Sequence, residues 1–187
     1  MRLSLSITEY PHEDIRGHLA RIVRAADEGG LDTVWVADHL LQAAPGASHE
    51  DPMLEAYTTL GYLAGRSERV RLGAMVSPAT YRAPALLLKA VMTLDELSGG
   101  RAWLGIGAGY HEEEARLFDL DLPPMRERFE RLEQMLRLAR RDFGPPLAPI
   151  AVALIALGVA GSIAVGHPLV PLFLVAAFLL WRRAACA

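Results

Sequence analysis

The first three quarters of the chain alternate between short apolar runs and longer stretches in which apolar residues recur every three or four positions. Thr33–Ala37 is one such run, and Ile15, Leu19 and Ile22 have the spacing of one helix face. This alternation predicts strands at 3–7, 33–37, 70–76 and 102–106, and helices at 12–28, 51–63, 84–97, 112–118 and 125–140.

The predicted helix ends follow from residues with defined backbone preferences. Asp51 and Pro52 form an N-cap and first-turn pair that we expect to open the second helix. The glycine pairs at 29–30 and 99–100 are expected to end the first and third helices, because glycine adopts the left-handed conformation of a C-cap at little cost.

Strands that alternate with helices predict an α/β fold of parallel strands joined by right-handed crossover connections. About four such units fit two architectures, namely part of an eight-stranded (β/α) barrel of the TIM type and a small open sheet. The periodicity of the sequence does not choose between them.

The remainder of the chain, from residue 143, differs in composition. Between Asp142 and Arg182 there is no Asp, Glu, Lys or Arg, and His167 is the only titratable residue. The segment 147–165 is long enough to cross a bilayer, whereas 169–181 is shorter and is interrupted by Pro171.

A helical hairpin over these two segments would place the arginine pairs at 140–141 and 182–183 on one side of a membrane, as the positive-inside rule requires. We therefore expect two domains, 1–142 and 143–187, with the second inserted in a membrane and the first in the cytoplasm. The alternative is a pair of buried helices in a soluble protein.

Overall composition excludes some kinds of partner. The net charge of −3 does not indicate binding to nucleic acid. Cys186 is the sole cysteine, so the chain has no internal disulfide and no cysteine cluster for a metal. His18, His49 and His111 lack metal-ligand spacing and are expected to be structural or exposed. The N-terminal residues lead directly into a strand, so no cleavable signal peptide is expected.

Polar or glycine-rich residues follow each predicted strand, and in parallel barrels the active-site groups come from these carboxyl ends. Asp38 and His39 directly follow the second strand, and Ser77 follows the third. A purely structural interpretation remains open, in which Asp38 caps a turn and His39 is exposed.

The run GIGAG at 105–109 ends the fourth strand. It does not match the dinucleotide motif G-x-G-x-x-G, because Tyr110 stands where the last glycine is needed. Its glycines still allow a close approach of backbone amides to an anion, although the glutamates at 112–114 would repel a phosphate placed too near. A tight turn that needs small residues explains the run equally well.

Three stretches together resemble a known family in their order and spacing. They are VWVADHLLQ, DPMLEAYTTLGYLAGRSERVRLGAMVSPATYRAPALLLKAVMTLDELSGGRAWLGIGAG and MRERFERLEQMLRLA. From residue 1 to about residue 140 the chain resembles the luciferase-like monooxygenase family, in its branch dependent on coenzyme F420.

The resemblance implies a TIM-type barrel that forms homo-oligomers, often dimers, and acts on a small-molecule substrate. It also implies that F420, or alternatively FMN, binds at the carboxyl ends of the second, third and fourth strands. A complete member continues through further strand–helix units beyond the region of resemblance.

Site residues are implied in the same way. His39 matches the histidine beside the cofactor ring and Asp38 its neighbour. A non-proline cis peptide that buttresses the ring is expected at Ala74–Met75, followed by Val76. Ala108 and Gly109 match positions whose backbone contacts the cofactor phosphate. Tyr110 replaces the acidic glutamate of the sugar-phosphate dehydrogenase branch, which argues against that substrate class.

These matches imply hydride transfer at the bound ring, with His39 handling a proton near neutral pH. Asp38 would fix the tautomer of His39 or hold the loop. The alternative function is an inactive half-barrel that serves as a membrane-tethered binding or scaffold module.

Overall fold

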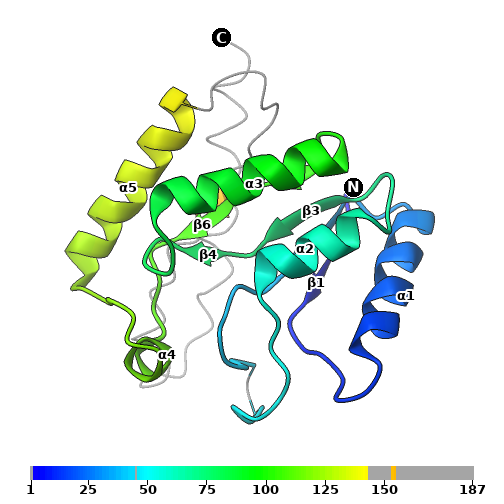
Figure 1. Cartoon of the computed structure of the whole chain (residues 1–187), viewed down its shortest axis with the longest axis horizontal. Coiled ribbons are helices and arrows are strands. Elements are labelled where there is room, and N and C mark those ends of the chain that lie inside the picture. Colours follow the sequence, from blue (N-terminus) through cyan, green and yellow to red (C-terminus); the bar gives the residue numbers. More distant parts are fainter. Residues whose placement is uncertain (1, 45, 143–152, 155–187) are drawn as a thin grey trace.

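The computed structural model describes residues 2–44, 46–142 and 153–154. Strands and helices alternate along the chain as the sequence predicts (Figure 1). In chain order the elements are β1 (Ser4–Ile7), α1 (Ile15–Glu28), β2 (Thr33–Val36), α2 (Ala56–Ala64), β3 (Arg71–Ala74), β4 (Ser77–Pro78), α3 (Pro84–Ser98), β5 (Ala102–Trp103), β6 (Gly105–Gly107), α4 (Glu112–Leu117), α5 (Met125–Asp142) and β7 (Ala153–Leu154).

The strands form two parallel sheets. One has the order β1-β2-β3-β5 and the other the order β4-β6-β7. The predicted third strand, 70–76, corresponds to β3, and β4 follows it after Met75 and Val76. The predicted fourth strand is two strands separated by Leu104. The parallel α/β arrangement is confirmed, and all the strand carboxyl ends in each sheet face the same way.

Helices α2 and α3 lie across the strands in Figure 1, with α1 and α5 to either side. Two apolar clusters fill the space between helices and strands. The first joins β1, β2 and β3 to α1 and α2, and the second joins β5 and β6 to α3 and α5. Fully buried side chains include Val23, Val34, Leu60, Leu63, Leu72, Leu87, Leu104, Ile106 and Met135. Each contributes roughly 1.5–3 kcal/mol of transfer free energy, so these clusters fix the strand positions.

The amino ends of the strands are held by two charged side chains. Asp27 of α1 accepts backbone N–H groups from the α2–β3 loop, at 3.2, 2.8 and 2.7 Å from Glu68, Arg69 and Val70. Arg101 donates to carbonyl oxygens at or just after the carboxyl ends of α2 and α3, namely those of Ala64, Ser67, Val70 and Ser98. Both charges satisfy backbone groups, so this end of the sheet is structural.

The predicted helix ends are confirmed at the glycine pairs but not at Asp51. Gly30, Gly99 and Gly100 have positive φ values of 71°, 71° and 84°. Helix α2 begins at Ala56 and is capped by Glu55, whose carboxylate accepts the Thr58 N–H at 2.6 Å.

The prediction that Asp51 opens this helix is wrong. The Asp51 carboxylate instead accepts the Ser48 N–H at 2.7 Å. This local side-chain-to-backbone bond competes with a helical start.

Most of the predicted membrane hairpin, 147–165 and 169–181, lies outside the described residues. At Ala153–Leu154 the prediction of a helix is wrong, because these residues form β7 and pair in parallel with Gly105 and Ile106. Strand pairing there satisfies backbone groups at the edge of β6. Within residues 2–44, 46–142 and 153–154, no helix combines the length and apolar character needed to span a membrane.

Gly105 gives a test of the strand packing. A Cβ at this position would collide with the carbonyl oxygen of Ala74, whereas a Cβ at the exposed helical residue Gly61 meets nothing within 4 Å. We expect Gly105→Ala to lower the free energy of unfolding by about 2–3 kcal/mol. Gly61→Ala should raise it by about 0.5–1 kcal/mol. Urea unfolding followed by circular dichroism measures both, and a Gly105→Ala protein as stable as the parent would contradict the close packing of β3 and β6.

Candidate functional site

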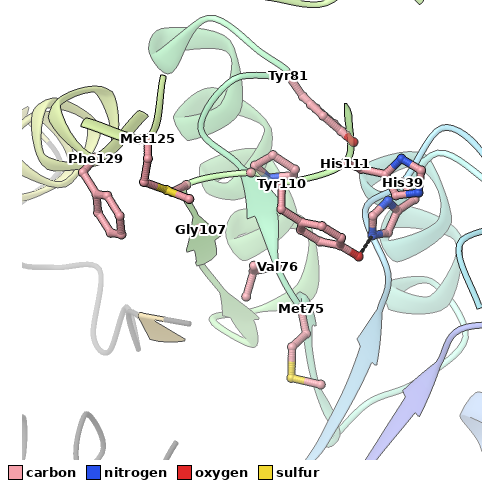
Figure 2. Close-up of a pocket in the computed structure, with 12 residues that line it drawn as sticks. His39, Met75, Val76, Tyr81, Gly107, Tyr110, His111, Met125 and Phe129 are labelled. Carbon is pink, nitrogen blue, oxygen red and sulfur yellow. Dashed lines mark hydrogen bonds between the residues drawn. The ribbon is translucent and has the colours of Figure 1, made fainter. Parts of the chain in front are cut away.

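A pocket lies at the carboxyl ends of the strands. His39 follows β2, Met75 and Val76 separate β3 from β4, and the segment 107–111 runs from the end of β6 to α4. Figure 2 shows the Tyr110 ring extending across the pocket toward His39, with Met125 and Phe129 of α5 on the opposite side. The other residues that line the pocket are Pro78, Tyr81, Gly107, Ala108, Gly109 and His111.

Most of the predicted site residues meet in this pocket. Asp38 and Ala74 are the exceptions, because both are buried and neither lines the pocket. His111, which was expected to be structural or exposed, lines the pocket and also caps α4, where its Nδ1 accepts the Glu114 N–H at 3.1 Å.

The non-proline cis peptide is Met75–Val76. The prediction of Ala74–Met75 is therefore wrong by one residue. The Met75 N–H still donates to the Val36 carbonyl at 2.9 Å, so residue 75 continues the hydrogen bonding between β2 and β3. The chain leaves the first sheet only after that residue.

Asp38 faces Arg82 rather than the His39 ring. The carboxylate is 2% exposed and accepts two hydrogen bonds from the guanidinium, at 2.6 and 2.9 Å. Arg82 also donates to Glu55 at 2.7 Å. Burial lowers the pKa of Arg82, but its bonds to Asp38 and Glu55 outweigh burial and raise it. Of the two roles considered for Asp38, this geometry favours holding the loop.

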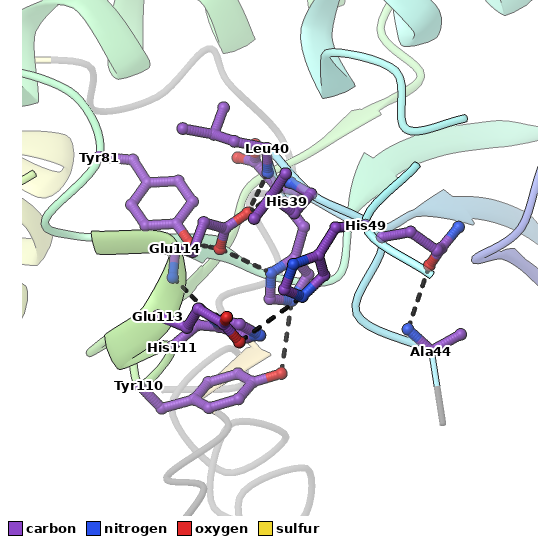
Figure 3. Close-up of polar contacts among 12 residues, drawn as sticks. His39, Leu40, Ala44, His49, Tyr81, Tyr110, His111, Glu113 and Glu114 are labelled. Carbon is purple, nitrogen blue, oxygen red and sulfur yellow. Dashed lines mark hydrogen bonds and ion pairs between the residues drawn. The ribbon is translucent and has the colours of Figure 1, made fainter. Parts of the chain in front are cut away.

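Glu114 is the carboxylate that contacts the imidazole. It is the third residue of α4 and is fully buried. Its Oε1 accepts the backbone N–H groups of Leu40 and Leu41, the latter at 2.8 Å, and its Oε2 lies 3.0 Å from His39 Nδ1 (Figure 3). The Tyr81 hydroxyl donates to the same Oε2.

These contacts set the charge of Glu114. Burial alone would raise the pKa of the carboxyl group. The hydrogen bonds from His39, Tyr81 and the two loop amides lower the pKa to about 2. Glu114 is therefore ionised at neutral pH although no solvent reaches it.

Tyr110 approaches His39 from the pocket. Its hydroxyl oxygen lies 3.4 Å from His39 Nε2, and the two rings meet edge to face with centroids 5.8 Å apart. Burial raises the pKa of the Tyr110 phenol, and the charge of Glu114 adds to this effect. Tyr110 is thus a neutral hydroxyl between the imidazole and the pocket.

The glycine-rich turn requires a small residue at 109. Gly109 has a φ of 81°, and a Cβ there would lie 2.9 Å from Thr80 Oγ1. That buried hydroxyl has no hydrogen-bond partner among the described residues. The turn therefore places a glycine of the pocket lining next to an uncommitted hydroxyl.

Sequence reasoning missed Tyr81, Arg82 and Glu114. Glu114 was treated only as one of three acidic residues near a helix start. Its partners His39, Leu40 and Leu41 lie more than 70 positions away, so nothing local in the sequence pointed to it. Tyr81 and Arg82 had no local signal either, since their partners also lie far away in the sequence.

The sequence of the chain is similar to those of known proteins. The family model described as luciferase-like monooxygenase matches residues 6–148. An F420-dependent glucose-6-phosphate dehydrogenase from Amycolatopsis mediterranei is 37% identical over 116 residues, which cover 62% of this chain and 34% of the relative. A 5,10-methylenetetrahydromethanopterin reductase from Archaeoglobus fulgidus is 33% identical over 116 residues, covering 60% and 32%.

The crystal structure of monooxygenase RslO1 from Streptomyces bottropensis is similar in fold. It superposes with a TM-score of 0.59 at 26% identity, covering 74% of this chain and 43% of that one. The chain spans about a third of the length of the curated relatives it matches.

The buried charge of Glu114 should make the free energy of unfolding depend on pH in the acid range. Its pKa is about 2 in the folded protein and 4.5 as a free side chain, so its contribution is complete above pH 4.5 and is lost as the pH falls toward 2. At neutral pH the parent should exceed Glu114→Gln in stability, and the gap should shrink by up to about 3 kcal/mol between pH 6 and pH 2.

The matched control for this titration is Glu113→Gln, whose side chain is 49% exposed. Chemical unfolding at a series of pH values should give this variant the pH profile of the parent. An unchanged gap between parent and Glu114→Gln across the acid range would show that Glu114 does not carry a depressed pKa.

Proposed function

The chain belongs to the luciferase-like monooxygenase family, and from this premise we propose that it is an oxidoreductase that uses coenzyme F420, with FMN as the alternative cofactor. The F420-dependent relatives support the choice of cofactor. Because the chain spans about a third of those relatives, activity, substrate and assembly are all proposals.

The observation that supports this function most strongly is the placement of His39 at the pocket. Its Nδ1 faces a buried carboxylate and its Nε2 faces Tyr110 at the pocket rim. An imidazole in this position is suited to general acid–base chemistry near neutral pH.

The surrounding residues fit a planar redox ring. Met75, Val76 and Phe129 supply apolar wall, and ligand sites of this kind combine such walls with a few polar groups. Gly109 lines the pocket beside the uncommitted Thr80 hydroxyl, which suits the polar tail of a cofactor. Met75, Val76, Ala108, Gly109 and Tyr110 are therefore the residues we propose to hold the cofactor, and the buried Ala74 would support Met75.

When bound, F420 would supply the hydride acceptor or donor. The chain's part is to orient the ring and substrate and to manage the proton. His39 Nε2 would take the proton from a substrate hydroxyl as it is oxidised, or return one to a carbonyl oxygen as it is reduced. Asp38 would act indirectly, because its bonds to Arg82 hold the loop that carries His39.

The substrate we propose is a small alcohol or carbonyl compound. Tyr110 occupies the position where the sugar-phosphate dehydrogenase branch is expected to carry a glutamate. A neutral phenol there offers no carboxylate to act as the acid, so we do not assign a sugar phosphate.

Cofactor binding is the first test. We expect the full chain, purified in mild detergent, to quench F420 fluorescence with a Kd in the micromolar range and to bind FMN more weakly. Failure to bind either at several hundred micromolar would favour the alternative of a non-catalytic binding or scaffold module.

The same preparation tests His39. We expect His39→Ala to retain F420 affinity within a few-fold and to lose about 10²–10⁴-fold in turnover, measured as loss of F420 absorbance with a panel of small alcohols. His12→Ala, at an imidazole that is 71% exposed, is the control and should match the parent. Parental turnover by His39→Ala would remove the catalytic role.

We also propose a homodimer and a membrane attachment through the apolar residues that follow β7. The family resemblance supports the first, and the apolar composition of that segment supports the second. Carbonate washing of membranes from expressing cells should leave the full chain in the pellet. Release into the wash would contradict an inserted segment.

A further inference from the structure

We propose that Glu114 is a positioning residue, which holds His39 in the tautomer with its proton on Nδ1 and leaves Nε2 as the acceptor at the pocket. The assignment deepens the proposed function, since it explains how His39 is prepared for proton transfer. It rests on the number and kind of hydrogen bonds at one carboxylate.

The orientation of the carboxylate is fixed by backbone groups. Oε1 accepts the N–H groups of Leu40 and Leu41, and a backbone N–H can only donate. This oxygen is therefore committed to the loop after β2. The other oxygen is left for Tyr81 and His39, which approach from two further segments (Figure 3).

An ionised carboxylate only accepts hydrogen bonds, so a contact of 3.0 Å between Oε2 and Nδ1 requires a proton on Nδ1. In a neutral imidazole Nε2 then carries a lone pair. That lone pair faces the pocket, where the Tyr110 hydroxyl oxygen lies 3.4 Å from Nε2. The contacts therefore run from the buried Glu114 carboxylate through the His39 ring to Tyr110, which lines the pocket.

Asp38 cannot serve this role although it adjoins His39 in the sequence. Both of its oxygens face Arg82, at 2.6 and 2.9 Å, and among the described residues Asp38 makes no hydrogen bond to the His39 ring. Tyr81 cannot replace Glu114 either, because it contacts the carboxylate rather than the imidazole.

Glu114→Gln gives a specific test, because glutamine has one accepting and one donating end. Its oxygen must remain with the amides of Leu40 and Leu41, so its NH₂ group is directed at Tyr81 and at His39 Nδ1. An NH₂ group donates to Nδ1 only if that nitrogen is unprotonated. The variant should therefore move the imidazole proton to Nε2.

The measurement is the pair of ring ¹⁵N chemical shifts of His39 in the full chain without cofactor. Histidine labelled with ¹⁵N in the ring is used at about pH 8.5, above the ordinary histidine pKa of about 6.5. The His39 signals are assigned with His39→Gln. The parent should show a protonated Nδ1 and a bare Nε2, and Glu114→Gln should show the reverse.

Tyr81→Phe is the matched control, since it removes a hydrogen bond from the same Oε2 but leaves the carboxylate an acceptor. It should lower stability while the tautomer stays as in the parent. A tautomer change in Tyr81→Phe equal to that in Glu114→Gln would reduce Glu114 to a structural role and overturn the proposal.

A parent protein with its proton on Nε2 would overturn the proposal by itself, whether or not Glu114→Gln folds. The readout needs no cofactor, so failure of F420 to bind would refute the proposed function without affecting this test. With both correct, Glu114→Gln should lose about 10²–10⁴-fold in turnover while its Kd for F420 stays within a few-fold of the parent.

Discussion

The Glu114 carboxylate joins three of the segments that surround the site. Glu114 belongs to α4. Its carboxylate accepts hydrogen bonds from two backbone amides and the His39 imidazole of the loop after β2, and from the Tyr81 hydroxyl between β4 and α3. A buried carboxylate is costly unless its oxygens are satisfied. Here the satisfying groups come from separate parts of the chain, so the charge is tolerated only when all of them are in place. The site geometry and the fold therefore depend on the same contact.

The two ends of the strands use charge differently. At the amino ends, Asp27 accepts hydrogen bonds from backbone amides of the loops and Arg101 donates hydrogen bonds to backbone carbonyls. Without these side chains the backbone groups would be unsatisfied. At the carboxyl ends, Asp38 and Glu114 contact side chains that reach the pocket or support it. This difference accords with the general placement of reactive groups at the carboxyl ends of parallel strands.

The sequence was informative where the signal is local. Apolar periodicity predicted the elements, glycine pairs predicted two helix ends, and the position of His39 after a strand predicted its place at the pocket. It failed where the outcome depends on distant partners. Glu114 meets residues more than 70 positions earlier, and Arg82 meets Asp38 across 44 positions. No pattern along the chain encodes such pairs.

Smaller errors have the same origin. The choice of Glu55 over Asp51 as helix cap depends on which carboxylate finds a competing backbone partner, and Asp51 finds Ser48. The cis peptide falls after Met75 because residue 75 still pairs with Val36. In both cases the residue type was compatible with either position, and a single hydrogen bond decided between them.

Asp38 and Glu114 show how partners separate the roles of two buried carboxylates. Asp38 pairs with a guanidinium that stays charged at every accessible pH, so its negative charge is already balanced. Glu114 receives its hydrogen bonds from two backbone amides, a phenol and the His39 imidazole. Its charge is therefore satisfied by hydrogen bonds rather than by a fixed counter-ion. Its contact with His39 Nδ1 fixes the orientation of the ring, so that Nε2 faces the pocket. The arrangement thus favours His39 as a group that accepts a proton during a reaction, whereas Asp38 can only hold its loop in place.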